Sequence, residues 1–255
     1  MKQSKCVYMF HAIGSKEKLT NCDLHYSYSK EEFELFLKRC VSSTSLQECL
    51  SDVTNSTKDV ITFDDGHVSN YDAAISIKEL ICGSADFFIN GNMVGKKGFM
   101  SWSQLREIQQ IGMSIQSHSL DHVYLSDLTY EQQLYQLTAG KKILEDKLGS
   151  EVVILAPPGG RYNQDTVNIC KKLGYEHISI SQPGRWSGGY LSSRIPVLRG
   201  TSVDELLSCK NIISPFMYKQ MAKYKITGTA KKILGNGLYD TVRTRLLSSE
   251  LGVNK

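Results

Sequence analysis

The sequence predicts an α/β protein in which helices cover a parallel β-sheet. Three observations lead to this prediction: short apolar segments alternate with amphipathic ones, the apolar segments are continuous, and glycines follow the amphipathic segments. A glycine at a helix C-terminus can adopt the left-handed conformation that releases the chain into the next strand. The length of 255 residues suits one large domain, and α/β barrels commonly have this size.

The predicted elements follow one another along the first 200 residues. The apolar segments with strand composition are residues 6–10, 60–63, 85–89, 113–116, 152–155 and 194–198. Helices are predicted after residues that commonly cap a helix N-terminus, namely Ser29, Ser69, Ser101, Thr129 and Asn163. Gly83, Gly112, Gly149 and Gly174 are predicted to end four of these helices.

Two adjacent carboxylates, Asp64 and Asp65, follow residues 60–63 and precede Gly66. Neighbouring carboxylates repel unless a cation or a proton intervenes, so the pair suits one metal ligand beside one free base. The alternative is a β-hairpin, because Asp-Gly is a strong turn signal. The helix predicted after Ser69 favours a strand–turn–helix unit instead. In βα-barrels, catalytic groups lie at the C-terminal ends of such strands.

A second polar cluster, which contains His118 and His122, follows residues 113–116. The spacing alone is weak evidence, because 6 histidines in 255 residues produce such pairs by chance. Its place at a strand end favours a site shared with the Asp pair, and a structural hydrogen-bonding role is the alternative. Two imidazoles and one carboxylate suit a catalytic divalent ion, commonly Zn²⁺.

A third cluster, residues 156–162, follows the next strand and contains two prolines and two glycines. Such a loop is rigid, and its backbone N–H groups could face a developing oxyanion. An ordinary tight connection is the alternative. The loop supplies four candidate substrate-binding residues, Pro158, Gly159, Arg161 and Tyr162.

Taken together, Thr-Phe-Asp-Asp-Gly, His-Ser-x-x-His and the Pro-rich strand end resemble the polysaccharide deacetylase family with the NodB homology domain. The resemblance covers roughly residues 7–198, and Met9-Phe10-His11 is similar to the aromatic–His segment that begins many members. It implies a distorted (β/α) barrel and metal-dependent removal of acetyl groups from sugars. By position, it makes Asp65, His118 and His122 the metal ligands and Asp64 the general base, with the backbone N–H near Gly159 facing the oxyanion.

Two positions depart from the family pattern. The Arg that usually begins the third motif and orients the base is replaced by Ala156, and Arg161 is its substitute if the loop folds back. The late motif usually supplies a His as general acid, but no His follows His177. His11 is then the nearest strand-end candidate for the acid, ahead of His67 and His177. Trp186 is a candidate for stacking on a sugar face, with simple packing as the alternative.

We therefore expect a metal-dependent hydrolase that removes an acetyl group from an N-acetylated or O-acetylated sugar or polysaccharide precursor. Zn²⁺ is the first candidate for the metal, followed by Co²⁺ or Ni²⁺. Opening of a non-sugar amide or cyclic imide is a minor enzymatic alternative. The alternative from a different class is a catalytically silent glycan-binding or scaffolding domain that keeps the fold and the metal. The missing Arg and His favour this silent domain, whereas the intact Asp64 opposes it.

Composition limits the class of protein and its location. At 41% hydrophobic and 22% charged residues, the chain is ordinary for a globular protein with a sizeable core. A net charge of +4 is too small to indicate a nucleic-acid partner. No signal-peptide core and no membrane-spanning apolar run is visible. Seven scattered cysteines without a Cys-x-x-Cys pair predict reduced thiols, and we expect a cytoplasmic location.

The positive charge collects at the C-terminal end, where nine Lys or Arg residues from Lys210 onward face two acidic residues. We divide the chain into a barrel of residues 1–210 and a basic helical extension of residues 211–255. The extension has the pattern of a helix that contacts an anionic membrane peripherally, with packing on the barrel as the alternative. Its apolar face is Phe216, Met217, Met221 and Tyr224, flanked by Lys219, Lys223 and Lys225.

Overall fold

The structure, a computed structural model, describes residues 4–15, 19–40, 42–51 and 58–250. The described strands form one nine-stranded sheet with the order β8-β7-β6-β5-β4-β3-β1-β9, and β2 pairs with β3 beside this path. Every pairing between these strands is parallel. The strands are β1 (Val7–Phe10), β2 (Ser43–Thr44), β3 (Asp59–Phe63), β4 (Asp86–Ile89), β5 (Ser114–Ser117), β6 (Ile154–Leu155), β7 (His177–Ser179), β8 (Leu191–Ser192) and β9 (Ile195–Pro196).

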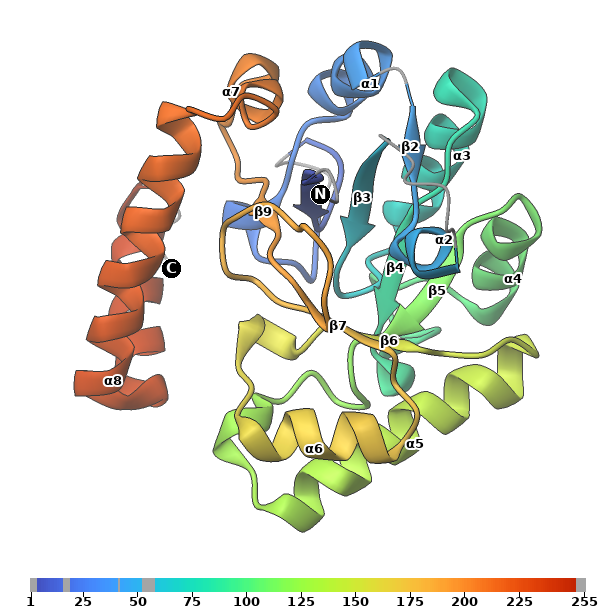
Figure 1. Cartoon of the computed structure of the whole chain (residues 1–255), viewed down its shortest axis with the longest axis vertical. Coiled ribbons are helices and arrows are strands. Elements are labelled where there is room, and N and C mark those ends of the chain that lie inside the picture. Colours follow the sequence, from blue (N-terminus) through green and yellow to red (C-terminus); the bar gives the residue numbers. More distant parts are fainter. Residues whose placement is uncertain (1–3, 16–18, 41, 52–57, 251–255) are drawn as a thin grey trace.

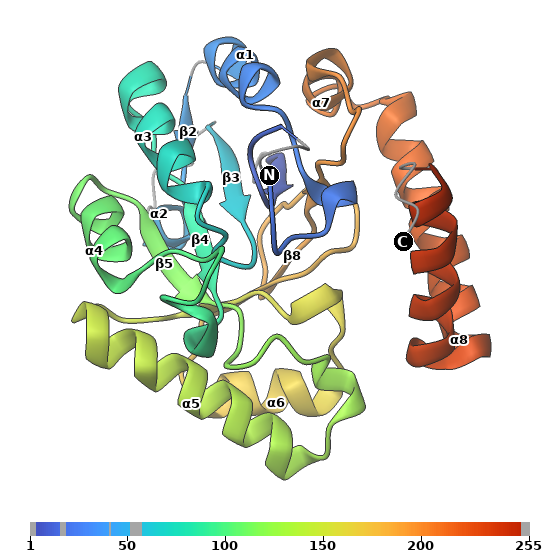
Figure 2. The same cartoon turned by 180° about the vertical axis from the view of Figure 1, so that it is seen from behind.

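Helices surround the sheet on its outside, and the longest of them, α8, stands along the side of the molecule next to α7 (Figure 1, Figure 2). The parallel strands with their connecting helices confirm the predicted α/β fold. The helices are α1 (Lys30–Cys40), α2 (Leu46–Ser51), α3 (Asn70–Ile81), α4 (Trp102–Gln110), α5 (Tyr130–Leu148), α6 (Gln164–Lys172), α7 (Val203–Ser208) and α8 (Pro215–Glu250).

The sheet curls into a barrel that is distorted, as expected. β1 lies between β3 and β9, so the first and last strands are neighbours, with Tyr8 of β1 opposite Ile195 of β9. β8 and β9 end the path and share no strand pairing within the described part of the chain. The barrel is therefore open between these two strands.

The capping signals in the sequence correspond to real helix starts. Ser101, Thr129 and Asn163 each accept a hydrogen bond from the backbone three residues on, and each forms a reciprocal capping box. Ser69 differs, because its side chain makes no cap hydrogen bond to α3. Its hydroxyl instead accepts the backbone N–H of Ile13, 2.9 Å away, and so ties the loop after β1 to the start of α3.

Alternation along the strands divides the core into two layers. Tyr8 and Phe10 of β1 point outward and pack on the aromatic residues of α1. Val7 points inward and shares a small apolar cluster with Val60 and Phe88 inside the barrel. Thr62 and Asp64 follow Val60 at two-residue intervals, so both face the barrel interior as well.

The first turns of α8, in the basic C-terminal extension, pack on the outer face of the barrel. Phe216 and Met217, in the first turn of α8, are buried, and Met221 packs against the same cluster. The apolar face that we expected to meet a membrane therefore contacts the barrel over its first two turns. Within the described residues, none of the helices has the length and apolar character needed to cross a bilayer.

Candidate metal centre and active-site cavity

The register of the sheet brings the predicted polar clusters to one edge. Phe10 lies opposite Phe63, so the exits of β1 and β3 are level, and His11 follows one while Asp64 follows the other. Ser117 of β5 lies opposite both Ile89 of β4 and Leu155 of β6, which makes these exits level too. Because the strands are parallel, all three clusters meet at the C-terminal edge.

Asp65, His118 and His122 gather at this edge in an arrangement that suits a metal ion. The Oδ1 atom of Asp65 lies 3.3 Å from Nε2 of His118 and 3.1 Å from Nε2 of His122. One ligand atom from each of the three residues lies within 4.8 Å of the others. The structure thus brings together the three residues that the sequence predicted as ligands.

A backbone contact fixes the tautomer of His118. Its Nδ1 lies 2.6 Å from the carbonyl oxygen of Ala156, and a carbonyl oxygen can only accept, so Nδ1 carries the proton. In the neutral ring, Nε2 then presents a lone pair toward Oδ1 of Asp65. That oxygen is buried and has no hydrogen-bond donor with suitable geometry among the described residues. Two lone pairs that face each other fit a shared cation, and the residues present therefore suit a divalent metal.

Positive charge beside Asp65 favours its ionised form. Burial alone would raise the pKa of this carboxyl, but imidazoles of His118 and His122 that carry a proton on the facing nitrogen, together with His11, hold it well below the usual range. The pKa of His122 responds in the opposite sense, since burial lowers it and the Asp65 carboxylate raises it above its ordinary value. The carboxylate is thus ready to serve as a ligand at neutral pH.

Backbone strain is concentrated in the two ligand loops. Asp65, Ser119 and His122 have positive φ angles of 73°, 64° and 56°, in a region that residues other than glycine rarely adopt. Such conformations cost on the order of 1–3 kcal/mol each and persist where the surroundings impose them. The strain therefore indicates that these loops are shaped for a function.

The His118 loop is held by close packing against α5. A Cβ atom built on Gly140 of α5 would lie 2.8 Å from the carbonyl carbon of Ser119 and 2.9 Å from the nitrogen of Leu120. The amide of Asn90 also donates to the carbonyl oxygen of His118, at 2.5 Å. A side chain at position 140 would displace backbone, so glycine is required for this fit.

Arg194 is the counter-ion of the predicted base. Its guanidinium donates two hydrogen bonds to Asp64, with 2.6 Å to Oδ1 and 2.9 Å to Oδ2, and a third to Thr62 Oγ1 at 3.3 Å. Arg194 has no exposed surface and its guanidinium lies over the ring of Phe88. Burial would raise the pKa of Asp64, but Arg194 outweighs it and holds the pKa below its ordinary value.

Arg194 makes the contact with the base that the third-motif Arg, replaced here by Ala156, would make. The sequence suggested Arg161 as the residue that replaces the missing third-motif Arg, but the structure gives the contact with Asp64 to Arg194. Arg161 lines the cavity, and its guanidinium lies 4.9 Å from the centre of the Tyr124 ring. Ala156 contributes through its backbone, because its carbonyl oxygen orients His118.

His11 lies beside this ion pair, at the exit of β1. Its ring packs on Tyr26 with 4.6 Å between the ring centres and 36° between the ring planes, and Asn70 donates to its backbone carbonyl at 2.6 Å. Burial is the main influence and lowers the pKa of His11, while the Asp65 and Asp64 carboxylates act against it. Its Nδ1 is buried and has no hydrogen-bond partner among the described residues.

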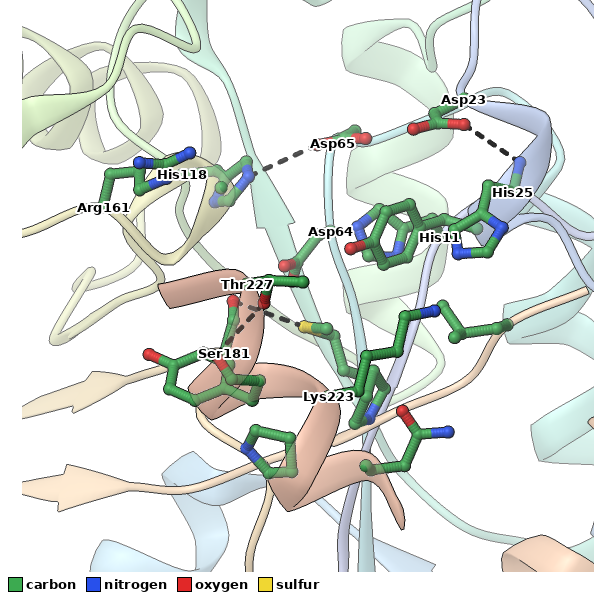
Figure 3. A pocket seen from close by; sticks show the side chains of 18 of the residues that line it. His11, Asp23, His25, Asp64, Asp65, His118, Arg161, Ser181, Lys223 and Thr227 are labelled. Carbon is green, nitrogen blue, oxygen red and sulfur yellow. Dashed lines mark hydrogen bonds and ion pairs between the residues drawn. The ribbon is translucent and has the colours of Figure 1, made fainter. Parts of the chain in front are cut away.

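These side chains surround one cavity of about 310 Å³ (Figure 3). On the barrel side it is lined by His11, Asp64, Asp65, His118 and His122. Gly159 and Arg161 of the Pro-rich loop reach it as predicted. The sequence did not point to its remaining polar and aromatic lining, which is Asp23, His25 and Tyr26 of the loop after β1, Tyr124, Ser181, and Gln220, Lys223, Tyr224 and Thr227 of α8.

Other candidates lie away from this cavity or behind its surface. Trp186 is buried at the opposite end of the barrel, where its backbone pairs with Lys5, just before β1, and its ring packs on His177. This corrects the expectation of sugar stacking in favour of packing. Within the Pro-rich loop, Pro158 is buried and Tyr162 packs against the core. His67 forms hydrogen bonds with the Ser69 hydroxyl and the Thr20 carbonyl.

The fold and the site define a (β/α)-barrel enzyme with carboxylate and imidazole groups at the C-terminal edge of its sheet. The family model described as polysaccharide deacetylase matches residues 52–178. The Bacillus subtilis protein named "Putative polysaccharide deacetylase YxkH" is 30% identical over 208 residues, which are 77% of this chain and 72% of that protein. The chain belongs to the polysaccharide deacetylase family, and it is a deacetylase-type hydrolase.

Further relatives agree with this family. A peptidoglycan-N-acetylglucosamine deacetylase of Bacillus cereus is 30% identical over 141 residues, 53% of this chain and 64% of that protein. Among solved structures, the Streptococcus pyogenes deacetylase PplD in complex with acetate superposes with a TM-score of 0.74 at 24% identity. The match covers 83% of this chain and 100% of that one. At this identity the likeness supports the distorted barrel fold alone.

Proposed function

We propose that the protein is a metal-dependent deacetylase that hydrolyses the acetamido group of an N-acetylated sugar, or the ester of an O-acetylated one. The observation that carries the proposal is the buried Oδ1 of Asp65, which faces Nε2 of His118 and of His122. Family membership and the names of the relatives support a glycan substrate.

Asp65, His118 and His122 would hold the ion, with Zn²⁺ as first candidate and Co²⁺ or Ni²⁺ as others. A divalent ion bound there would supply Lewis-acid polarisation of the acetyl carbonyl and lower the pKa of a water molecule. The carbonyl oxygen of Ala156 keeps His118 in the tautomer that such binding needs.

Asp64 would act as the general base that takes a proton from the attacking water. Arg194 holds both carboxylate oxygens, so the base keeps one orientation toward the cavity. This pairing supplies an Arg for the base although Ala156 replaces the usual one. It therefore weakens one of the two arguments for a catalytically silent domain. The backbone near Gly159, which lines the cavity, would face the oxyanion that forms during attack.

His11 would give a proton to the leaving group. It lines the same cavity as Asp64 and Asp65, and its buried Nδ1 has no partner among the described residues. A nitrogen in this position could meet the amine that leaves as the acyl carbon–nitrogen bond breaks. Its ring is kept in place by Tyr26, and its backbone by Asn70.

A reducing compartment, and hence the cytoplasm, is our proposal for the location. All seven cysteines are free thiols in the structure, and four of them (Cys6, Cys40, Cys170 and Cys209) are buried. Burial raises the pKa of the Cys170 thiol to about 12, which keeps it protonated and unreactive.

The test combines metal analysis with acetate release from N-acetylglucosamine oligomers. We expect about one divalent ion per chain, and loss of both metal and activity in the His118→Ala, His122→Ala double variant. His67→Gln serves as a control, because His67 lies outside the cavity and should leave both unchanged. Full metal occupancy in the double variant contradicts the assigned site. Metal binding without acetate release from any acetylated sugar supports the silent domain instead.

A further inference from the structure

The C-terminal helix forms one wall of the active-site cavity. Gln220, Lys223, Tyr224 and Thr227 of α8 line it, on the side that faces the loops of the barrel. Their spacing of three and four residues places them on a single helical face. Figure 3 shows Lys223 and Thr227 on this helix beside Ser181, with Asp64 and His11 beyond them.

Lys223 brings a positive charge to the cavity that no carboxylate in the described part of the chain neutralises. Among the described residues, its side chain forms no ion pair and no hydrogen bond. Two other lysines of the same helix, Lys219 and Lys225, are exposed like Lys223 but do not line the cavity. The position of Lys223 is therefore distinct from that of its neighbours.

Asp64 is already neutralised by Arg194. A divalent ion at Asp65 would carry more charge than that single carboxylate, and Lys223 would add to the excess. The cavity would then favour a substrate that carries a negative charge of its own.

Tyr224 lies next to Lys223 and provides an aromatic surface beside the charge. Its side chain is 39% exposed. Arg161 of the Pro-rich loop lines the same cavity, so helix and loop face each other there. Burial raises the pKa of the Tyr224 phenol, and Arg161 acts against this. A sugar ring bound between them would have a stacking surface and a cation within reach.

We propose that Lys223 binds an anionic substituent, a phosphate or a carboxylate, on the acetylated sugar that this enzyme deacetylates. The inference rests on the proposed function and narrows it from acetylated sugars in general to those that carry a negative charge near the acetyl group. The α8 helix is then the part of the chain that selects the substrate, while the barrel performs the chemistry.

The experiment compares three probes with the metal-loaded protein: N-acetylglucosamine, N-acetylglucosamine 1-phosphate and N-acetylmuramic acid. We expect at least one charged probe to bind about tenfold more tightly than the neutral one, and the two charged probes distinguish phosphate from carboxylate. Lys223→Met should abolish this preference and raise KM more than it lowers kcat, whereas Lys223→Arg should restore it. Lys219→Met and Lys225→Met are the matched controls and should behave like wild type.

Binding measured by calorimetry separates this inference from the proposed function. If no probe releases acetate but a charged probe binds through Lys223, the proposed function fails and the anion site stands. If the neutral probe is bound and hydrolysed as well as both charged probes, the anion site fails and the deacetylase stands. An equal loss in Lys223→Met and Lys225→Met also overturns the assignment, because it would show a general charge effect.

Discussion

The two walls of the cavity are built in opposite ways. In the barrel wall, Asp64 and His118 are buried and held in place, Asp64 by Arg194 and His118 by the carbonyl oxygen of Ala156. In the α8 wall, Gln220 is buried, but Lys223 and Tyr224 are exposed. The helix that carries them is anchored by its first turn, through Phe216 and Met217. Chemistry needs groups fixed within fractions of an ångström. A lysine, by contrast, carries a compact charge on a flexible stem and can reach an anion without such rigid support. We therefore propose that the barrel wall performs catalysis and that the α8 wall selects the substrate.

The largest effect is expected from the barrel wall, at Asp64. Asp64→Asn should lower acetate release by about a hundredfold to ten-thousandfold, the usual contribution of a general base. Metal content should stay the same, since Asp65 remains the ligand. Equal activity of the variant and wild type, with metal bound in both, contradicts the base assignment but leaves the fold intact.

Arg194→Met should cause the next largest change, in stability. Loss of the guanidinium leaves a buried carboxylate unpaired, which typically costs about 3–5 kcal/mol of unfolding free energy near neutral pH. Urea unfolding measures this loss. The Asp64→Asn, Arg194→Met double variant should recover part of it, because the charge that lacks a partner is then gone.

The single variant Arg194→Met should also change the pH dependence of stability. In wild type the pKa of Asp64 is depressed, so its stabilising contribution is present above the unfolded-state pKa of about 4 and is lost as pH falls through the folded-state pKa. Without Arg194, burial raises this pKa, and the deficit of the variant should grow as pH rises above about 4. A deficit that does not change between pH 4 and pH 8 argues against the ion pair as its cause.

A smaller effect is expected from Gly140→Ala, which presses on the His118 loop without touching a ligand. The added methyl group would meet the backbone at Ser119 and Leu120, and we expect metal affinity to fall by roughly tenfold. Gly228→Ala in α8 is the control, because its Cβ would meet nothing within 4 Å. Competition with a chelator measures both affinities, and equal values would show that the loop tolerates displacement.

The smallest effect concerns α8 and an anionic membrane, a contact that we keep as a proposal. Part of the predicted apolar face packs on the barrel, which leaves exposed residues such as Tyr218 and Ile226 beside Lys219 and Lys225. We expect weak sedimentation with anionic vesicles that salt abolishes, since each lysine near the surface contributes about 1 kcal/mol. Lys219→Glu combined with Lys225→Glu should remove it. Absence of sedimentation at low salt rejects the contact.

Sequence alone predicted the parts of the site that depend on local order along the chain. Asp64, Asp65, His118 and His122 follow strands with clear apolar composition, so their common edge follows from a parallel sheet. The caps at Ser101, Thr129 and Asn163 were predicted for the same reason, because each signal lies within four residues. Strands β7 and β8 were missed, since three and two residues give too little pattern.

The features of the site that the sequence did not predict depend on contacts between residues that are far apart in the chain. Arg194 lies 130 residues after Asp64, and it begins the last predicted strand rather than a recognised motif. One signal in the sequence could have suggested this role. Arg194 is a charged residue next to a strand whose inward side chains fill the barrel interior. The α8 wall gave no such signal, because a helix face that lines a cavity and one that packs on a protein have the same sequence pattern.

The pairing of Asp64 with Arg194 also has a consequence for the order of folding. The ligand residues and the base lie between positions 64 and 122, but the charge that neutralises the base arrives only with residue 194. Until β9 docks beside β1, the half-formed barrel contains a carboxylate without a counter-ion. Exclusion of water from its interior then costs free energy, because that charge is buried unpaired. Long-range contacts of this kind slow folding and make it cooperative. We therefore expect fragments that end before Arg194 to remain loosely packed, although they contain every proposed metal ligand.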